Sequence, residues 1–412
     1  MSPGPRASDS NTVGRPGLLH ACVTIGCVVA TPTIDPALQT KAKEYARISR
    51  QLFFVELGLD AVLIVAWLAF GWALWLKSAL LHLTTNEWLL VPLFGALFFL
   101  FFQVIELPLA FYSGFTLPHR YDQSNQTLAG WIKDQVLSLV LAAVIGLPVV
   151  EIVYWLLRVT GPAWWLWAAV GYVVFVVLIS GLAPVLIMPL FNKYVPLGPE
   201  HADLIDRLKR LAERSGTRIS GIFRFDMSQR TKGANAALTG IGGSRRIILG
   251  DTLLAEFTPD EVESVIAHEL GHQVHHDIPV GIVVSSLVTL VGLFIVSLEL
   301  TGSARALGFS GPADVGALPL LALAFGAFGL LTLPLNNAYS RWREVRADAY
   351  ALESTQNPQA FSGAMTRLAN QNLADADPPA WVVFLMHSHP PIRQRLAMAA
   401  NWKPRAASRE NS

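Results

Sequence analysis

Residues 258–300 read TPDEVESVIAHELGHQVHHDIPVGIVVSSLVTLVGLFIVSLEL, and they place a polar, helix-forming segment directly before an apolar one. Thr258 suits a helix N-cap, Pro259 suits the first helical position, and Glu261 completes a capping box with Thr258. Residues 278–300 form an apolar run as long as the roughly 20 residues that a helix needs to cross a bilayer. The sequence therefore predicts a helix outside the membrane that is followed at once by a membrane span.

The rest of the chain is also apolar. Its 412 residues have a mean hydropathy of +0.43, and 15% of them are charged, whereas soluble proteins have about 25%. Six segments are predicted to span the membrane: residues 52–76, 88–112, 135–157, 164–190, 278–300 and 315–335. The fold is therefore predicted to be mainly α, that of a polytopic membrane protein.

The polar segments divide the chain into regions. We expect an N-terminal segment of uncertain structure at 1–50, spans one to four at 51–190, a soluble insertion at 191–277, spans five and six at 278–335, and a C-terminal catalytic region at 336–412. The insertion is predicted to contain a charged helix at 200–215 and strands at 219–225 and 246–249. The C-terminal region is predicted to be helical at first and disordered at its end. Residues 18–29 could form a seventh span, a signal-like segment or an unstructured leader.

Charge and cysteine content exclude several classes of partner. The 31 basic and 30 acidic residues give a net charge of +1, which leaves no field for collecting nucleic acid. Cys22 and Cys27 support neither a disulfide framework nor a thiolate zinc site. Basic residues gather in alternate short loops: Lys41, Lys43, Arg47 and Arg50 before the first span, and Arg120 and Lys133 after the second. The positive-inside rule then places the soluble insertion and the C-terminal region in the cytoplasm.

Several acidic residues fall within predicted spans: Glu56, Asp60, Glu106, Glu151 and Glu299. A charged side chain in lipid is costly, so these groups should face a protein interior or a watery cavity. Each one alone could instead lie near a span end and reach the interface. Together they favour a hollow helical bundle.

The segment Ala267-His268-Glu269-Leu270-Gly271-His272 contains the pattern H-E-x-x-H on the predicted helix. Residues four apart project from one helix face, so His268 and His272 can offer two imidazole nitrogens to one ion. Glu269 lies about 100° around the axis, where it can reach a water beside that ion. His275 and His276 fall past the metal-facing positions and are interpreted as interfacial. A zinc site of this kind needs a third protein ligand.

Residues 340–350, SRWREVRADAY, supply candidates for that ligand. Glu344 and Asp348 are four apart on a predicted helix, so one can bind the metal while the other hydrogen-bonds a ligand imidazole. Two spans separate them from His272, which returns the chain to the same side of the membrane. We predict that Glu344 is the third ligand and that Asp348 orients a histidine.

With these residues the sequence resembles the type I CAAX prenyl proteases, which are integral-membrane zinc peptidases. The resemblance covers residues 53–396. Besides the zinc motifs it includes His119-Arg120-Tyr121, Asn125-Gln126-Thr127, Leu190-Phe191-Asn192-Lys193, Asn235-Ala236, Arg246-Ile247-Ile248-Leu249, Asp251-Thr252-Leu253-Leu254, and Ser388-His389-Pro390-Pro391 with Arg395. The family usually has seven spans, whereas six are identified here.

The resemblance implies a zincin-like soluble domain with a small β-sheet, one zinc ion per chain, and a water-filled chamber enclosed by the helices. It implies that Asn235 and Ala236 lie on an edge strand that pairs with the substrate backbone. It also implies that His389 and Arg395 approach the metal from the C-terminal region, where they stabilise the oxyanion or bind substrate carbonyl and carboxylate groups.

The function predicted from these features is that of a membrane-embedded zinc metalloendopeptidase. Its partners are predicted to be membrane lipid and a peptide or protein substrate, with or without a prenyl group, and the chain itself is predicted to be monomeric. A quality-control protease with no prenyl requirement would keep the same catalytic residues. A zinc transporter should hold its ligands near the membrane midplane, and a non-catalytic scaffold has no need of Glu269 as a general base.

Overall fold

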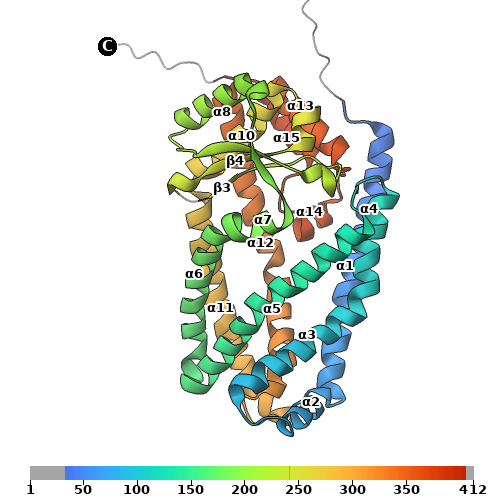
Figure 1. Ribbon diagram of the computed structural model, residues 1–412, viewed down its shortest axis with the longest axis vertical. Helices are drawn as coiled ribbons and strands as arrows, with labels where there is room; N and C mark the ends of the chain where they lie inside the picture. Colours follow the sequence, from blue (N-terminus) through green and yellow to red (C-terminus); the bar gives the residue numbers. More distant parts are fainter. Residues whose placement is uncertain (1–32, 241, 405–412) are drawn as a thin grey trace, which may run out of the picture. The chain divides into compact units, whose positions relative to one another are not determined.

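The computed structural model describes residues 33–240 and 242–404 of the chain. The candidate span at 18–29, both cysteines and the last eight residues lie outside these ranges. The described part contains six helical stretches that are long and apolar enough to cross a membrane. They are built on α1 (Pro36–Ala69), α3 (Glu87–Phe111), α5 (Leu128–Val159), α6 (Trp164–Leu182), α11 (Asp277–Ala306) and α12 (Leu318–Thr355). The prediction of six spans is therefore confirmed (Figure 1).

The helix of the first span starts before the predicted span, and the predicted end at residue 76 was wrong. Its helix begins at Pro36, where the Asp35 side chain accepts hydrogen bonds from two backbone N–H groups as an N-cap. It ends at Ala69, and the chain then turns through Gly71 at a φ of 69°, a conformation that glycine adopts without strain. Residues 72–76 therefore belong to a separate short helix, α2 (Trp72–Leu81).

Two spans continue through π-helical turns into short helices. The turn Tyr112–Thr116 leads from α3 into α4 (Leu117–Arg120), and the turn Ala183–Ile187 leads from α6 into α7 (Met188–Phe191). Prolines lie in or just after these turns, and they lack the N–H group that would continue the α-helical ladder. These stretches carry the chain out of the membrane part toward the sheet (Figure 1).

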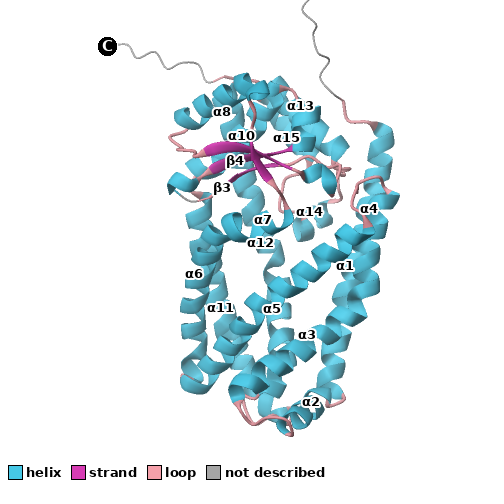
Figure 2. Cartoon of the chain, viewed as in Figure 1, coloured by secondary structure: helices cyan, strands magenta, loops and turns pink. Residues whose placement is uncertain are grey.

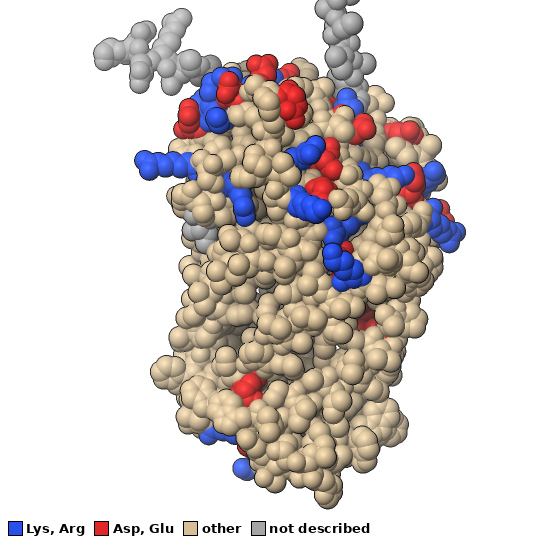
Figure 3. All heavy atoms as spheres, viewed as in Figure 1, with Lys and Arg blue, Asp and Glu red and all other residues tan. Residues whose placement is uncertain are grey.

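The long helices expose large apolar side chains that a soluble protein would bury. Val62, Val144 and Leu331 are among them, with exposed fractions of 66%, 64% and 77%. On the face shown in Figure 3, Lys, Arg, Asp and Glu gather mainly at the end that carries the sheet, and few lie along the long helices. This distribution is that of a chain solvated by lipid over its helices and by water at one end.

The acids within the spans behave in two ways. Asp60 and Glu106 line a cavity of about 470 Å³ between α1, α3 and α12, as a hollow bundle requires. Glu151 instead forms an ion pair with Arg158, with 3.0 Å between Arg158 Nη2 and Glu151 Oε1. The cavity supports the hollow bundle for Asp60 and Glu106. For Glu151, the nearby Arg158 compensates the charge without a cavity.

The soluble part contains a four-stranded sheet (Figure 2). Its strands are β1 (Tyr194–Pro196), β2 (Gly221–Phe225), β3 (Ala236–Thr239) and β4 (Arg246–Gly250), in the order β1-β2-β4-β3. Strands β2 and β4 are parallel, and β3 pairs antiparallel to β4 as an edge strand. The predicted strands at 219–225 and 246–249 are confirmed as β2 and β4, whereas β1 is too short to give a sequence signal.

Helices pack around this sheet. Apart from α14 (Ala380–Met386), whose backbone carbonyls accept hydrogen bonds from Asn337 and Arg341 of α12, they are α8 (Ala202–Arg214), α9 (Asp251–Glu256), α10 (Pro259–Val274), α13 (Pro358–Gln371) and α15 (Ile392–Asn401). Their shared core includes Ile247 and Leu249 of the sheet, Ile266 and Leu270 of α10, and Phe361 of α13. Helical structure extends to Asn401, and residues 405–412, where disorder was predicted, lie outside the described ranges.

Candidate metal centre and peptide-binding edge

The helix α10 starts with the capping box that its sequence predicts. The Thr258 side chain accepts a hydrogen bond from the Glu261 backbone N–H (3.3 Å), and the Glu261 carboxylate accepts one from the Thr258 N–H (2.8 Å). Arg367 of α13 also donates to Glu261 at 2.9 Å. The start of α10 is therefore fixed from two sides, which sets the rotation of the helix and the face on which His268 and His272 lie.

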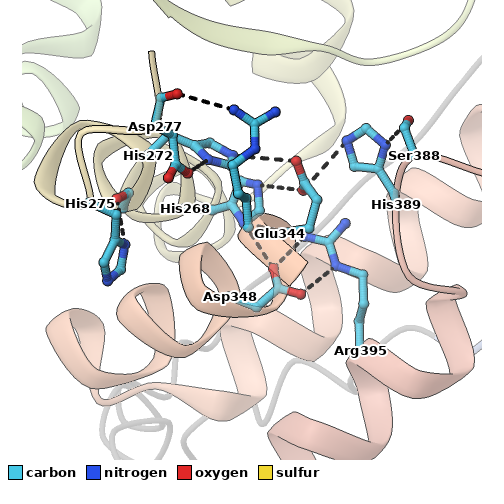
Figure 4. A network of polar contacts seen from close by, with 11 residues as sticks. His268, His272, His275, Asp277, Glu344, Asp348, Ser388, His389 and Arg395 are labelled. Carbon is cyan, nitrogen blue, oxygen red and sulfur yellow. Dashed lines mark hydrogen bonds and ion pairs between the residues drawn. The ribbon is translucent and has the colours of Figure 1, made fainter. Parts of the chain in front are cut away.

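A glycine lets α12 approach the second half of α10. A Cβ atom at Gly271 would lie 2.9 Å from the Cα atom of Ala347, closer than real Cβ contacts. The two backbones therefore meet at this point. The contact brings Glu344 and Asp348, one turn apart on α12, against the two histidines of α10 (Figure 4).

The three predicted ligands form one cluster. His268 Nε2 lies 3.2 Å from Glu344 Oε2, and His272 Nε2 lies 3.5 Å from Glu344 Oε1. One ligand atom from each residue lies within 4.8 Å of the other two. Glu344 Oε2 is buried, yet within the described residues no donor makes a hydrogen bond to it. Two imidazoles and a carboxylate with an orphaned oxygen are a donor set that fits zinc.

Each histidine is oriented through its other ring nitrogen. His268 Nδ1 lies 2.8 Å from Asp348 Oδ1, and Asp348 also accepts a hydrogen bond from Arg395 Nε at 2.8 Å. A proton on Nδ1 that is donated to Asp348 leaves the Nε2 lone pair facing Glu344. Burial lowers the pKa of His268, but the hydrogen bond with Asp348 and the nearby Glu344 carboxylate outweigh burial and raise this pKa to about 9. A proton therefore competes with a metal ion for this ring.

The partner of His272 was missed by the sequence analysis. His272 Nδ1 lies 2.7 Å from the Oδ2 atom of Asp277, a buried residue at the start of α11. Arg343 Nη1 donates to the backbone carbonyl of Asp277 at 3.2 Å. An acidic residue five positions after the second histidine, where an apolar span begins, was the available signal. Asp277 has the same relation to His272 as Asp348 has to His268.

Glu269 lies beside the cluster and faces the sheet. Burial raises the pKa of its carboxyl group, and the backbone N–H of Leu238 donates a hydrogen bond to it. Leu238 belongs to β3, the edge strand that the family resemblance predicted at Asn235 and Ala236. Ala236 is the first residue of β3, and Asn235 directly precedes it. The carboxylate next to the metal cluster therefore meets the strand edge on which a peptide could lie.

His389 and Arg395 take different positions. His389 Nε2 lies 3.4 Å from Glu344 Oε2, and its Nδ1 lies 2.9 Å from Ser388 Oγ. Both residues line a cavity of about 640 Å³ together with Asn235. The buried guanidinium of Arg395 binds Asp348 through two nitrogens, and its Nη2 atom also lies 3.4 Å from His268 Nδ1. Partial desolvation by neighbouring protein atoms lowers the pKa of His389 and favours its neutral form, although 61% of the side chain is exposed.

The two remaining histidines stay outside the cluster. His275 Nδ1 lies 2.8 Å from the carbonyl oxygen of Gly271, and its ring points away from Glu344 (Figure 4). His276 has a φ of 55° and forms the bend between α10 and α11. Neither belongs to the group of residues that could hold a metal ion.

Known proteins share both halves of this architecture. The family profile described as "CAAX prenyl protease N-terminal, five membrane helices" matches residues 28–193, and "Peptidase family M48" matches residues 199–403. The chain is 32% identical over 372 residues to the "Uncharacterized metalloprotease YhfN" of Bacillus subtilis, which covers 89% of this chain and 86% of that protein. It is 32% identical over 315 residues to "CAAX prenyl protease 1" of Saccharomyces cerevisiae, covering 71% and 68%.

A solved structure agrees with the fold. The crystal structure of S. mikatae Ste24p matches with a TM-score of 0.79 and 25% sequence identity, and the match covers 90% of each chain. These similarities confirm the predicted fold class, the zinc requirement and the peptidase activity. The chain belongs to peptidase family M48 and is a membrane-embedded zinc metallopeptidase similar to the CAAX prenyl proteases.

Proposed function

We propose that His268, His272 and Glu344 hold the zinc ion and that Glu269 is the general base for peptide hydrolysis. The observation that carries this proposal is the buried Oε2 atom of Glu344, which has no hydrogen-bond donor among the described residues and lies near His268 Nε2 and His389 Nε2. Bound zinc supplies a Lewis acid that polarises the scissile carbonyl and lowers the pKa of water to about 7. Asp348 and Asp277 keep the two imidazoles in the tautomer that binds metal through Nε2.

Glu269 moves the proton. Its carboxylate takes a proton from the attacking water and then delivers it to the leaving amine. The Leu238 N–H fixes this carboxylate against the edge strand, so base and peptide are held by the same element. A peptide that pairs with the backbone at Ala236 would place its scissile bond next to Glu269, while the exposed Asn235 side chain contacts it from the cavity.

His389 donates to the reacting carbonyl oxygen. Its lowered pKa favours the neutral ring, and Ser388 Oγ can donate to Nδ1. The proton then resides on Nε2, which faces the metal cluster and can bind the developing oxyanion. Arg395 acts as a positioning residue for His268, through Asp348 and through the contact of its Nη2 atom with the His268 ring.

The substrate is proposed to be a prenylated peptide cut near its carboxyl end, because the curated relatives are named CAAX prenyl proteases. Residues 191–277 and 336–412 form the catalytic part, and residues 51–190 and 278–335 form the membrane part. The catalytic part faces the cytoplasm, in keeping with the basic residues gathered around it. In a bacterium the membrane would be the cell membrane, and the active form is a monomer in contact with lipid.

The test uses purified full-length protein in detergent with one zinc per chain. Matched peptides with and without a prenyl group are incubated with the enzyme, with and without a chelator. We expect zinc-dependent hydrolysis that is faster for the prenylated peptide. Equal rates for the two peptides would instead support a quality-control protease with no prenyl requirement. Hydrolysis that persists with the chelator would refute the metal mechanism.

A further inference from the structure

The free edge of β3 follows from the pairing of this strand with β4. Gly250 N donates to Asn235 O at 2.9 Å, so Asn235 is a hydrogen-bonded partner of β4. Hydrogen-bonded and non-bonded positions alternate along an antiparallel pair. The register therefore turns the N–H and C=O groups of residues 234, 236 and 238 away from β4 and toward the free edge.

A side chain already occupies the first of these three positions. Asn372 Oδ1 accepts the N–H of Ala234 at 2.7 Å, and Asn372 Nδ2 donates to the carbonyl of Ala234 at 3.2 Å. This amide thus makes the two bonds that a peptide group of a neighbouring strand would make. Asn372 ends α13 and lies 138 positions away in the sequence, so tertiary structure alone brings it to this edge.

The residues before Ala234 are held as firmly. Thr252 Oγ1 donates to the carbonyl of Gly233 at 2.7 Å, and Gln371 Nε2 donates to the carbonyl of Lys232 at 2.9 Å. A Cβ atom at Gly233 would lie 2.9 Å from Asn372 Oδ1, so a side chain there would displace the amide. These contacts keep Asn372 and Ala234 in one arrangement.

The third position is partly occupied. The N–H group of Leu238 donates to Glu269, the proposed general base. At Ala236, by contrast, none of the residues in the described ranges makes a side-chain hydrogen bond to the backbone, and the methyl group packs in the soluble core. Asn235 and Asn372 both line the 640 Å³ cavity and a second cavity of about 550 Å³. The edge is therefore bonded to Asn372 at one end and to the base at the other, and between them the outward backbone groups of Ala236 have no side-chain partner among the described residues.

We propose that Asn372 is a specificity-determining residue that sets the register of the bound peptide. It blocks pairing at Ala234, so the peptide must begin its pairing at Ala236, and one bond of the peptide is brought to Glu269. Strand pairing repeats every two residues, so loss of the block would let a peptide bind displaced by two residues. The inference rests on the proposed function, since it needs a peptide on this edge.

The experiment maps the cleaved bond by mass spectrometry for one long peptide that the wild-type enzyme cuts at a single bond. Asn372→Ala frees both Ala234 groups, and we expect a second product pair from a bond two residues away. Asn372→Asp keeps the acceptor for the Ala234 N–H and should retain mainly the original bond. Asn370→Ala is the matched control, because Asn370 lies on the same helix but binds Thr33 O (3.0 Å) and the Asp35 N–H (3.1 Å).

The outcomes separate the register proposal from the peptidase proposal. No zinc-dependent cleavage by the wild-type enzyme would refute the peptidase proposal itself. Wild-type cleavage with the same single bond cut by Asn372→Ala, or an equal shift in Asn370→Ala, would overturn the role of Asn372 alone. Zinc content and melting temperature are measured for each variant. If Asn372→Ala does not fold, Asn372→Ser decides, because its hydroxyl is too short to bond both Ala234 groups.

Discussion

Replacing Asp277 by alanine tests the support of the metal centre at a residue that touches only one ligand. The Asp277 carboxylate lies 2.7 Å from His272 Nδ1 and is buried. A water molecule in the space left by alanine would be a weaker hydrogen-bond acceptor for Nδ1 than the carboxylate. Partners of this kind are typically worth 10–100-fold in metal affinity, or about 1.4–2.7 kcal/mol. Arg343 contacts the backbone carbonyl of Asp277, and that contact survives the substitution. The loss should therefore stay local to His272.

The assay is a competition for zinc between the purified protein and a chromophoric chelator of known affinity. We expect Asp277→Ala to bind zinc 10–100-fold more weakly, because the His272 ring loses its orientation and a basic partner. Asp277→Asn keeps an acceptor for the Nδ1 proton and should fall between alanine and wild type. Unchanged zinc affinity in Asp277→Ala, with a wild-type melting temperature, would refute this reading of His272.

Four further predictions concern the same site. Glu269→Gln should keep zinc but lose hydrolysis by 100-fold or more, because an amide cannot accept the proton of water; metal analysis and peptide kinetics check this. Gly271→Ala should lower both zinc occupancy and melting temperature, since its Cβ would lie 2.9 Å from the Cα atom of Ala347; a normal melting curve would contradict it. The pKa of His268, raised to about 9, means that its ring is protonated at pH 7 without metal, so zinc binding should release this proton and weaken as pH falls below 9. Calorimetry in buffers of different ionisation enthalpy measures that release. Asn235→Ala should lower kcat while zinc content and stability stay near wild type, and a loss of stability instead would make it a turn residue.

Local patterns predicted the catalytic helix and the spans. The capping box at Thr258 needs residues only three apart, and the pair Glu344 and Asp348 needs one helical turn, so both could be read directly. The break at Gly71 could not, because the apolar run continues through it and the turn depends on one backbone conformation.

Contacts between distant segments left no comparable signal. Asn372 reads as the polar end of a helix, and only the packing of α13 beside β3 makes it a stand-in for a strand. Asp277 reads as an acidic residue at a membrane boundary, and its role depends on the bend at His276. The edge strand β3 was predicted from the family resemblance. Its four residues show no clear apolar and polar alternation, so their pattern alone could not predict a strand.

The contact between His272 and Asp277 places the metal cluster next to the start of the span α11. Asp277 is the first residue of a helix long enough to cross the membrane, and its carboxylate touches a ring of the metal cluster. The metal cluster therefore lies at the first turn of a helix that is long and apolar enough to cross the membrane. Three extended residues reach about 10 Å. A chain tethered in the bilayer by one end can deliver a bond three residues from its tether, whereas a bond inside a folded soluble protein would have to be unravelled and lowered to the membrane surface first.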